Sequence, residues 1–426
     1  MSQKPDTIPV RPEESLNQEK LSVYLKSKLE GANTPLNIRQ FPGGKANLTY
    51  HLSYKNYEYV LRRPPLGPVA LGAHDMSREY SVLSTLHQTF TLAPKAYLYE
   101  EDPSIVGAPF FIMERKHGLV IRTEMPNEFS NISSAGEKIS LALVDALVEL
   151  HKVNYSELGL GELGKPEGFI RRQVEGWYKR WCDAKHQDIS DVETLYDWLI
   201  SNLPKSGQTS LVHNDYKLDN CMFSFNDPNL LVAIFDWDMC TLGDPLSDLG
   251  SLLCYWIDPG DPPLFANSLI MPKDESFLSR KQLVQRYAEK SGIDTRQITF
   301  YHVLGLFRLI GIVAQIYIRF LKGQTKDKRF TIDKKMTNKL HIDFDKPDLP
   351  KTDFLSILKS RITFAIIIVL LIFVWMLSDD FSEEKNEKAS GKDDKNTDKV
   401  FVVSAQKVQN QETYKVVRAS GVLRPI

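Results

Sequence analysis

The sequence is poor in the features that would assign it directly to a class of protein. Four of its 426 residues are cysteines, and none of them forms a Cys-x-x-Cys pair. We therefore expect reduced thiols in or near the core, rather than a disulfide framework or a zinc site. The formal net charge is −1, so we expect no nucleic acid as a partner. The polar N-terminus contains no apolar run, so we expect no signal peptide there.

One long apolar run interrupts an ordinary composition, in which 42% of residues are hydrophobic and 25% are charged. Residues 362–377 carry no charge and fall just short of the usual spanning length of about 17–25 residues. Lys359 and Arg361 precede the run and acids follow it, which places the preceding part in the cytosol by the positive-inside rule. We predict one helix through the inner membrane over 362–378, with a buried core helix as the alternative.

The composition also changes along the chain, and these changes predict its organisation. We expect two folded lobes followed by a charged, disordered tail. The expected divisions are a flexible N-terminus (1–14), an N-terminal lobe (15–115), a helical lobe (116–348), a linker (349–361), the membrane helix (362–378), a charged disordered linker (379–399) and a β-like fragment (400–426).

The first lobe has the pattern strand, glycine-rich turn, strand, strand, helix, strand, strand. A helix over residues 15–29 precedes this series, and Asp75 is the expected N-cap of the later helix over 74–88. We predict a five-stranded sheet with one main helix. The expected strands are 36–41, 48–54, 57–63, 95–100 and 108–115.

The second lobe has the 3.6-residue periodicity of helices. It contains one predicted hairpin, with Asp227-Pro228-Asn229 as its turn. Arg308 and Arg319 interrupt the most apolar helix and argue against a second membrane span, and we expect His302 on that helix to be a core or groove residue. The predicted helices are 133–154, 169–184, 192–203, 246–255, 277–290 and 298–321.

Acids and amides cluster where this lobe would be buried. The stretch HNDYKLDN places Asn220 five residues after Asp215, which is the spacing of a kinase-type catalytic loop. An Asp there can accept a hydroxyl proton, and an Asn oxygen can bind Mg²⁺. Asp236 follows the next apolar strand and would supply the second Mg²⁺ ligand, because Mg²⁺ prefers hard oxygen ligands.

A glycine-rich turn and a basic strand lie upstream of these acids. Gly43 and Gly44 would let backbone N–H groups approach a phosphate, although an ordinary hairpin also explains them. Arg62 and Arg63 end the third strand, and strand alternation allows only one of them to face a cleft. A helix bearing Glu79 follows, as in the basic residue–glutamate pair of kinases.

Together these stretches resemble the aminoglycoside phosphotransferase/choline kinase family, and within it the phosphotransferases related to the kinase-like domain of acyl-CoA dehydrogenase family proteins. The resemblance covers about residues 36–258, and the helices to about 348 suit the family's substrate lobe. It implies an α+β, bilobal protein-kinase-like fold with a five-stranded N-lobe and a mostly helical C-lobe. The matching stretches are FPGGKANLTYHL, YVLRRPPLGPVALGAHDMSREYSVLSTL, PFFIMERKHG, LVHNDYKLDNCMF and VAIFDWDMCTLGDPLSDLG.

The resemblance also implies residue roles. Asp215 would be the catalytic base, and Arg62 would bind phosphate in place of the usual lysine, which is chemically sound because an arginine fork fits phosphate oxygens. Asp248 would brace the catalytic loop, and His213 would be a structural loop residue. The implied nucleotide-binding residues are Gly43, Gly44, Asn47, Arg62, Glu79 and Glu114, with Asn220 and Asp236 as Mg²⁺ ligands and ATP as the phosphoryl donor.

Two positions depart from the family pattern. Asn214 stands where a glycine is usual, and Asp238 stands where a glutamate is common. Neither change removes a primary ligand. We expect the first to reshape the loop and the second to weaken a supporting contact.

The C-terminal stretch over 400–426 is similar to the first strand of the periplasmic adaptor proteins of efflux pumps. The similarity ends before the hairpin and barrel of an adaptor. Two adjacent reading frames joined together, or a truncated fusion, would each explain such a chain, and a truncated efflux adaptor is one alternative for its function.

The expected function is ATP-dependent transfer of a phosphoryl group to a small-molecule hydroxyl on the cytosolic side of the membrane. A catalytically silent kinase-like binding module or membrane-held scaffold is the runner-up. The acceptor could be a hydroxyacyl-CoA or an aminoglycoside. Four basic residues could attract an anionic acceptor or form a solvated helix face, and they tilt the choice away from an aminoglycoside: Arg171, Arg172, Lys179 and Arg180.

Overall fold

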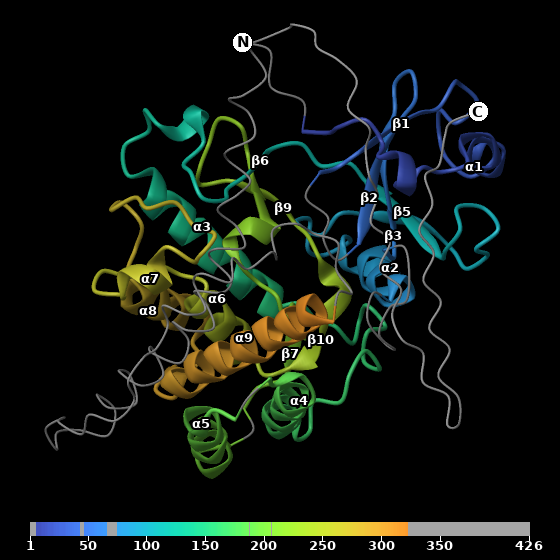
Figure 1. The fold of residues 1–426 in the computed structure, drawn as a ribbon. Helices are drawn as coiled ribbons and strands as arrows, with labels where there is room; N and C mark the ends of the chain where they lie inside the picture. Colours follow the sequence, from blue (N-terminus) through green and yellow to red (C-terminus); the bar gives the residue numbers. More distant parts are fainter. Residues whose placement is uncertain (1–5, 43–46, 66–74, 187, 206, 323–426) are drawn as a thin grey trace, which may run out of the picture. The chain divides into compact units, whose positions relative to one another are not determined.

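A computed structural model gives the fold, and it describes residues 6–42, 47–65, 75–186, 188–205 and 207–322 (Figure 1). Gly43 and Gly44 lie outside the described residues. So do the expected membrane helix over 362–378, both linkers around it and the β-like fragment. Those assignments therefore stay predictions.

The N-terminal lobe is built on the predicted five-stranded sheet. All of its neighbouring strands are antiparallel, in the order β1-β2-β3-β5-β4. The five-stranded lobe expected from the sequence is thereby confirmed. The strands are β1 (Asn37–Gln40), β2 (Leu48–Ser53), β3 (Glu58–Arg63), β4 (Ala96–Glu100) and β5 (Phe110–Glu114).

A helix covers each face of this sheet. Successive strand residues point to opposite faces, so neighbours on one strand pack against different helices. Leu61 of β3 packs in one apolar cluster with Leu21 and Leu25 of α1 (Gln18–Leu25). Val60, the preceding residue, packs in the other cluster against α2 (Met76–Leu86). The Asp75 side chain accepts hydrogen bonds from the second and third residues of α2, as its predicted role of N-cap requires.

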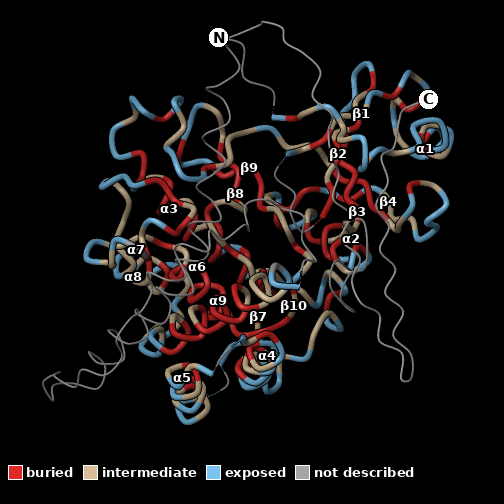
Figure 2. The backbone as a smooth tube through the Cα atoms, viewed as in Figure 1, coloured by how far each residue is buried: buried red, intermediate tan, exposed pale blue. Residues whose placement is uncertain are grey.

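The second lobe is mostly helical, as expected. Its long apolar helix α9 packs against α6, α4 and α5, and α3 packs against α8. Buried residues concentrate on these shared faces (Figure 2). The helices are α3 (Ala135–His151), α4 (Phe169–Ala184), α5 (Ser190–Ser201), α6 (Leu246–Cys254), α7 (Pro263–Ala266), α8 (Arg280–Ser291) and α9 (Ile298–Leu321).

The expectation of a single two-stranded insert in this lobe is wrong. The predicted hairpin, β8 (Cys221–Phe223) and β9 (Leu231–Ile234), gains a third strand, β6 (Leu119–Val120). A separate sheet pairs β7 (Ser210–Val212) with β10 (Thr241–Gly243). Strands of two or three residues are too short to show an alternating pattern, so sequence periodicity could not reveal them.

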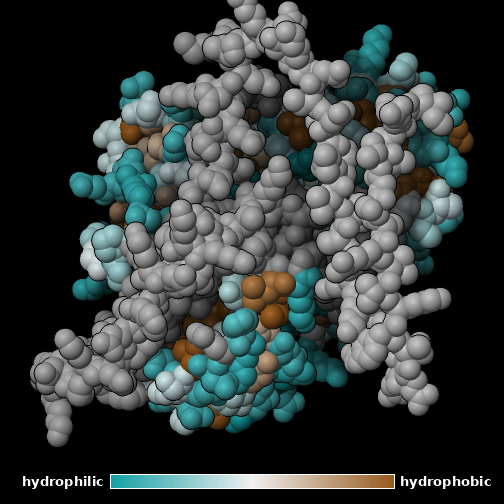
Figure 3. Space-filling model, viewed as in Figure 1, coloured by the Kyte–Doolittle hydropathy of each residue, from teal (hydrophilic) through white to brown (hydrophobic). Residues whose placement is uncertain are grey.

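Helix α9 is the one helix in the described part that is long and apolar enough to cross a membrane. That composition is weak evidence for a span, because α9 packs among other helices of the lobe. The described surface on the side drawn in Figure 3 is mainly hydrophilic, with a few hydrophobic patches. All four cysteines are free, and Cys182 is the one that is not fully buried.

The contact between α6 and α9 depends on glycine. A Cβ added at Gly250 of α6 would lie 2.4 Å from the carbonyl oxygen of Tyr301 on α9. Gly305 faces the same contact, where an added Cβ would lie 2.8 Å from the carbonyl oxygen of Gly250. The two helix backbones therefore touch at this point.

We expect Gly250→Ala to destabilise the domain. Alanine would gain about 1 kcal/mol of helix propensity, but overpacking against a backbone typically costs about 1–3 kcal/mol. Thermal unfolding of the variant should show a lower Tm than that of the wild type. Gly161→Ala is the matched control, because nothing lies within 4 Å of a Cβ at Gly161. Equal Tm values for the two variants would contradict the close helix contact.

Candidate active site

The loop after β7 carries Asp215, whose side chain is half-buried. The side-chain amide of Asn220 donates to the Asp215 carbonyl (2.8 Å) and to its carboxylate Oδ2 (2.9 Å). The Nζ of Lys217 lies 3.2 Å from the same Oδ2. The two residues predicted from the motif spacing thus lie side by side, with a cation beside them.

Lys217 is a site residue that the reading of the sequence missed. Its aliphatic chain is largely buried, and its Nζ lies 5.2 Å from the ring centre of Tyr255. Burial opposes the charged form and is the largest single influence, but Asp215, Asp219 and other nearby acidic groups together raise the pKa of Lys217 well above its usual value. The signal was present in the sequence, as a lysine two residues after the predicted base.

Asn214 adopts a left-handed backbone conformation, with φ of +64°. Glycine takes this conformation without a penalty, and asparagine tolerates it better than most other residues. Its side-chain amide also donates to the carbonyl of Met239 (3.0 Å). Asparagine therefore occupies a backbone conformation that suits glycine, and its side chain adds a contact to the loop that follows Asp236.

Asp248, on α6, holds this loop from behind. Its two carboxylate oxygens accept the backbone N–H groups of His213 (2.6 Å) and Asn214 (2.7 Å). Burial works to raise the pKa of Asp248, but its hydrogen bond to His151 (3.2 Å) and the nearby histidine charges hold it below its usual value. His151 in turn contacts the Tyr287 hydroxyl (2.7 Å), which continues the chain to α8.

His213 is fully buried and joins the two loops of the site. Its Nε2 lies 2.9 Å from the carbonyl of Phe235, and its Nδ1 accepts the backbone N–H of Asp215 (3.2 Å). Both ring nitrogens are therefore occupied by the backbone. The ring positions the loop and is not placed to take a substrate proton.

Arg62 links the N-terminal lobe to the second loop. Its NH2 donates to Asp236 Oδ1 (2.8 Å), and its Nε lies 3.2 Å from Glu79 on α2. Arg63 points to the other face of the sheet and donates to the Val106 carbonyl. Of the two arginines at the end of β3, Arg62 is thus the one beside the acids.

The acids beside Arg62 differ in charge preference because their surroundings differ. Burial raises the pKa of Glu79 to about 8, although Arg62 opposes the rise. Burial also acts on Asp236, but Arg62 outweighs it and lowers the Asp236 pKa. Burial and then the Asp236 charge raise the pKa of Asp238 to about 7. The positive charge of Arg62 therefore acts on three neighbouring acids, Glu79, Asp236 and Asp238.

Asn220 and Asp236 suit the Mg²⁺ site predicted from the sequence. The backbone N–H of Phe235 donates to the Asn220 carbonyl (2.9 Å), which sets the two loops side by side. The amide nitrogen of Asn220 is committed to Asp215, so its amide oxygen is the atom that can face a cation. The described residues contain no group of three or more His, Cys, Asp or Glu side chains that could hold a metal. One carboxylate and one amide oxygen are hard donors of the kind that Mg²⁺ binds while it keeps several of its waters.

The remaining predicted nucleotide-binding residues are less informative. Asn47 is buried at the start of β2. The Glu114 side chain accepts from the Lys95 backbone N–H (3.2 Å) and pairs with Lys116 (3.0 Å). The backbone N–H of Glu114 also donates to the Lys95 carbonyl (2.8 Å), so both the side chain and the N–H already have partners.

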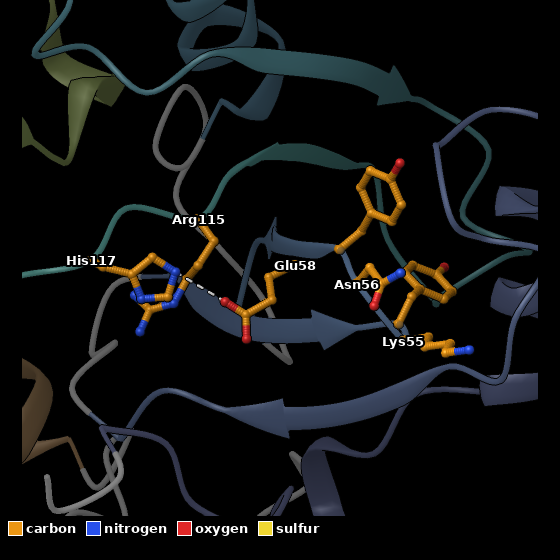
Figure 4. Close-up of a pocket in the computed structure, with 7 residues that line it drawn as sticks. Lys55, Asn56, Glu58, Arg115 and His117 are labelled. Atoms are coloured by element: carbon orange, nitrogen blue, oxygen red, sulfur yellow. Dashed lines mark ion pairs between the residues drawn. The ribbon is translucent and has the colours of Figure 1, made fainter.

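A surface groove of roughly 470 Å³ lies elsewhere, at the turn between β2 and β3. Glu58 and His117 form an ion pair across it (3.0 Å), and Arg115 lies beside them (Figure 4). Asp215, Asn220 and Asp236 do not line this groove. It is therefore not the place where the predicted chemistry would occur.

The fold and the site define a phosphotransferase of the protein-kinase-like class. The chain belongs to the phosphotransferase enzyme family, whose profile matches residues 37–275. Asp215, Asn220, Asp236, Arg62 and Glu79 all fall within that range. The resemblance to this family noted from the sequence is thereby confirmed.

Curated relatives include acyl-CoA dehydrogenase family members 11 and 10. The chain is 32% identical over 330 residues to member 11 of Rattus norvegicus, covering 76% of this chain and 42% of that protein. It is 31% identical over 345 residues to member 10 of Mus musculus, covering 79% of this chain and 31% of that protein. The chain thus spans less than half the length of the curated relatives it matches.

A solved structure of a Ralstonia eutropha JMP134 protein, assigned as an aminoglycoside phosphotransferase, has a similar fold. The TM-score is 0.63 at 26% identity, and the match covers 85% of this chain and 98% of that chain. The similarity supports the bilobal, kinase-like arrangement of the fold.

We expect Asn214→Gly to be tolerated and Asn214→Val to be destabilising. A β-branched residue at a positive φ costs on the order of 1–3 kcal/mol, whereas glycine loses only the contact to Met239. Thermal unfolding should rank the wild type and Asn214→Gly well above Asn214→Val. The exposed Asn226→Val serves as a control for the added side chain. A Tm for Asn214→Val equal to that of Asn214→Gly would refute the strained-loop explanation.

Proposed function

We propose that the protein is an ATP-dependent phosphotransferase that transfers the γ-phosphoryl group to a hydroxyl of a small molecule. The observation that carries this proposal is the cluster formed by Asp215, Asn220 and Asp236, with Arg62 beside it. An acceptor base, two oxygen ligands and a phosphate-binding cation are the parts that phosphoryl transfer requires. The acceptor is a hydroxyacyl-CoA-like or aminoglycoside-like compound.

Asp215 would orient the acceptor hydroxyl and receive its proton. The acceptor oxygen forms a bond to the γ-phosphorus, and the bond from that phosphorus to the β–γ bridging oxygen breaks, which releases ADP. The carboxylate is held by Asn220 and Lys217, so it is in place before the acceptor arrives. The cation of Lys217, beside Asp215, would also stabilise negative charge on the transferred group.

Asn220 and Asp236 would hold Mg²⁺, which when bound neutralises charge on the donor phosphates. In the structure Asp236 pairs with Arg62 through one carboxylate oxygen. The guanidinium can bind phosphate oxygens with the same fork. Arg62 therefore keeps the acids compensated until a nucleotide is bound, and Glu79 fixes its position.

The membrane helix over 362–378 and a cytosolic location for the two lobes remain part of the proposal. The charges around the apolar run support them. The adaptor-like fragment over 400–426 lies outside the described residues. A catalytically silent scaffold is the competing function, and the following variant separates it from an enzyme.

We expect Asp215→Asn to lower kcat by about 10²–10⁴-fold, because an amide cannot accept the proton. Mg-ATP binding should change little, since the proposed ligands Asn220 and Asp236 remain. ADP release with a panel of hydroxyacyl-CoAs and aminoglycosides measures the first effect, and isothermal titration with Mg-ATP measures the second. Asp227→Asn, in an exposed turn, is the control. Undiminished turnover in Asp215→Asn would remove Asp215 from the mechanism, and no turnover in the wild type would favour the silent scaffold.

A further inference from the structure

Three of the four basic residues of α4 have partners close by in the sequence. Arg171 pairs with Glu175 (3.5 Å), and Lys179 pairs with Asp183 (2.8 Å). Arg172 donates to two main-chain carbonyls in the turn before the helix. These three side chains belong to the solvated surface of the helix.

Arg180 is different from its neighbours. Its guanidinium carbon lies 4.6 Å from the ring centre of Trp177, and no carboxylate in the described part of the chain pairs with it. Partial burial and, after it, the charge of Arg308 lower the pKa of Arg180. Arg180 is exposed to solvent, yet its side chain lies in the field of another cation.

Arg308, on α9, approaches the same indole. Its guanidinium carbon lies 5.4 Å from the ring centre of Trp177. The residue is only 7% exposed, and the polar contact of its guanidinium in the described structure is to the Asn214 carbonyl (2.5 Å). Two guanidinium groups thus share one aromatic ring without an acid paired to either.

This arrangement is electrostatically unfavourable unless a negative group joins it. A cation over an aromatic ring is stabilised, but a buried charge such as Arg308 loses more free energy when it leaves water without a counter-charge. The repulsion between the two guanidinium groups adds to that cost. A phosphate or carboxylate placed between them would offset both the lost hydration and the repulsion. A guanidinium fork also matches the geometry of either anion.

The arginine pair also lies close to the candidate base. Arg308 contacts Asn214, the residue before Asp215. Burial raises the pKa of the Tyr255 phenol, and among the charges that act on it are Lys217, Asp215 and Arg308. Lys217 connects Asp215 (3.2 Å) to the Tyr255 ring (5.2 Å), and Arg308 reaches the same loop through the Asn214 carbonyl.

We propose that Arg180 and Arg308, resting on Trp177, form a binding site for an anionic group of the acceptor, at a distance from the hydroxyl that receives the phosphoryl group. This inference rests on the proposed function and specifies the charge of its acceptor. A cationic aminoglycoside would be repelled by the pair. An acceptor that carries a phosphate or a carboxylate would be held beside Asp215.

Matched acceptors test the site. The full-length chain is assayed with 3-hydroxybutyryl-CoA, with the neutral 3-hydroxybutyryl-N-acetylcysteamine thioester, with free 3-hydroxybutyrate and with kanamycin. We expect the wild type to prefer an anionic acceptor, the CoA thioester if phosphate is the recognised group and the free acid if carboxylate is. In Arg180→Ala the ratio of kcat/KM for the anionic acceptor to that for the neutral thioester should fall about tenfold, mainly through KM, because a charge-assisted contact is lost.

Arg171→Ala is the matched control, because Arg171 lies on the same helix and is paired with Glu175. It should leave the ratio at the wild-type value. The preference for the anionic acceptor should also weaken as salt is raised, since ions screen a partly exposed site. Equal ratios in Arg180→Ala and Arg171→Ala would overturn the inference, as would a wild type that uses neutral and anionic acceptors equally well.

A binding measurement separates failure of this inference from failure of the proposed function. Coenzyme A and 3-hydroxybutyrate are each titrated calorimetrically into the full-length chain in the presence of ADP. If either anion binds, if that binding weakens in Arg180→Ala, and if no acceptor is phosphorylated, the anion site is supported and the proposed phosphotransferase function is refuted. If the neutral thioester or kanamycin is phosphorylated and neither anion binds, the proposed function is supported and the anion site is refuted.

Discussion

The buried carboxylate of Asp248 is the constraint on which the candidate active site depends. It accepts the backbone N–H groups of His213 and Asn214, and so fixes the loop that presents Asp215. A charged group this deeply buried is stable only when its acceptor sites are filled, and His151 fills another of them. The loop geometry and the charge of Asp248 therefore support each other. The positive φ of Asn214 follows from the same constraint, because both successive N–H groups must turn toward one carboxylate.

The two loops of the site are joined from both lobes. His213 ties the Asp215 loop to Phe235, while Arg62 ties the N-terminal sheet to Asp236. Arg308 reaches the carbonyl of Asn214 from the helical lobe. Arg62 thus lies beside Asp236 on the side proposed for the donor phosphates, and Arg308 contacts the Asp215 loop on the side proposed for an anionic acceptor. One physical requirement, compensation of buried charge, explains the nucleotide side and the proposed acceptor side together.

Much of this site was predictable from local patterns in the sequence. The sequence predicted a common site for Asp215 and Asn220 from their spacing, and for Asp236 from its position after an apolar run. The structure places the loops that carry these residues side by side. Helices α4 and α9 also have their predicted bounds, because each shows an unbroken apolar periodicity. What failed depends on contacts between distant segments. The very short strands of the helical lobe leave no periodic signal, and the role of Arg180 cannot be seen without Arg308, which comes from another helix.

The central claim is that this site transfers a phosphoryl group to a hydroxyl. Phosphorus NMR of the wild-type chain with Mg-ATP and a hydroxyl acceptor tests it most directly, because the spectrum separates a phosphate monoester from inorganic phosphate. The account predicts that ADP and a phosphate monoester of the acceptor appear together in equal amounts. ATP that stays intact with every acceptor, or that yields only ADP and inorganic phosphate, would contradict it.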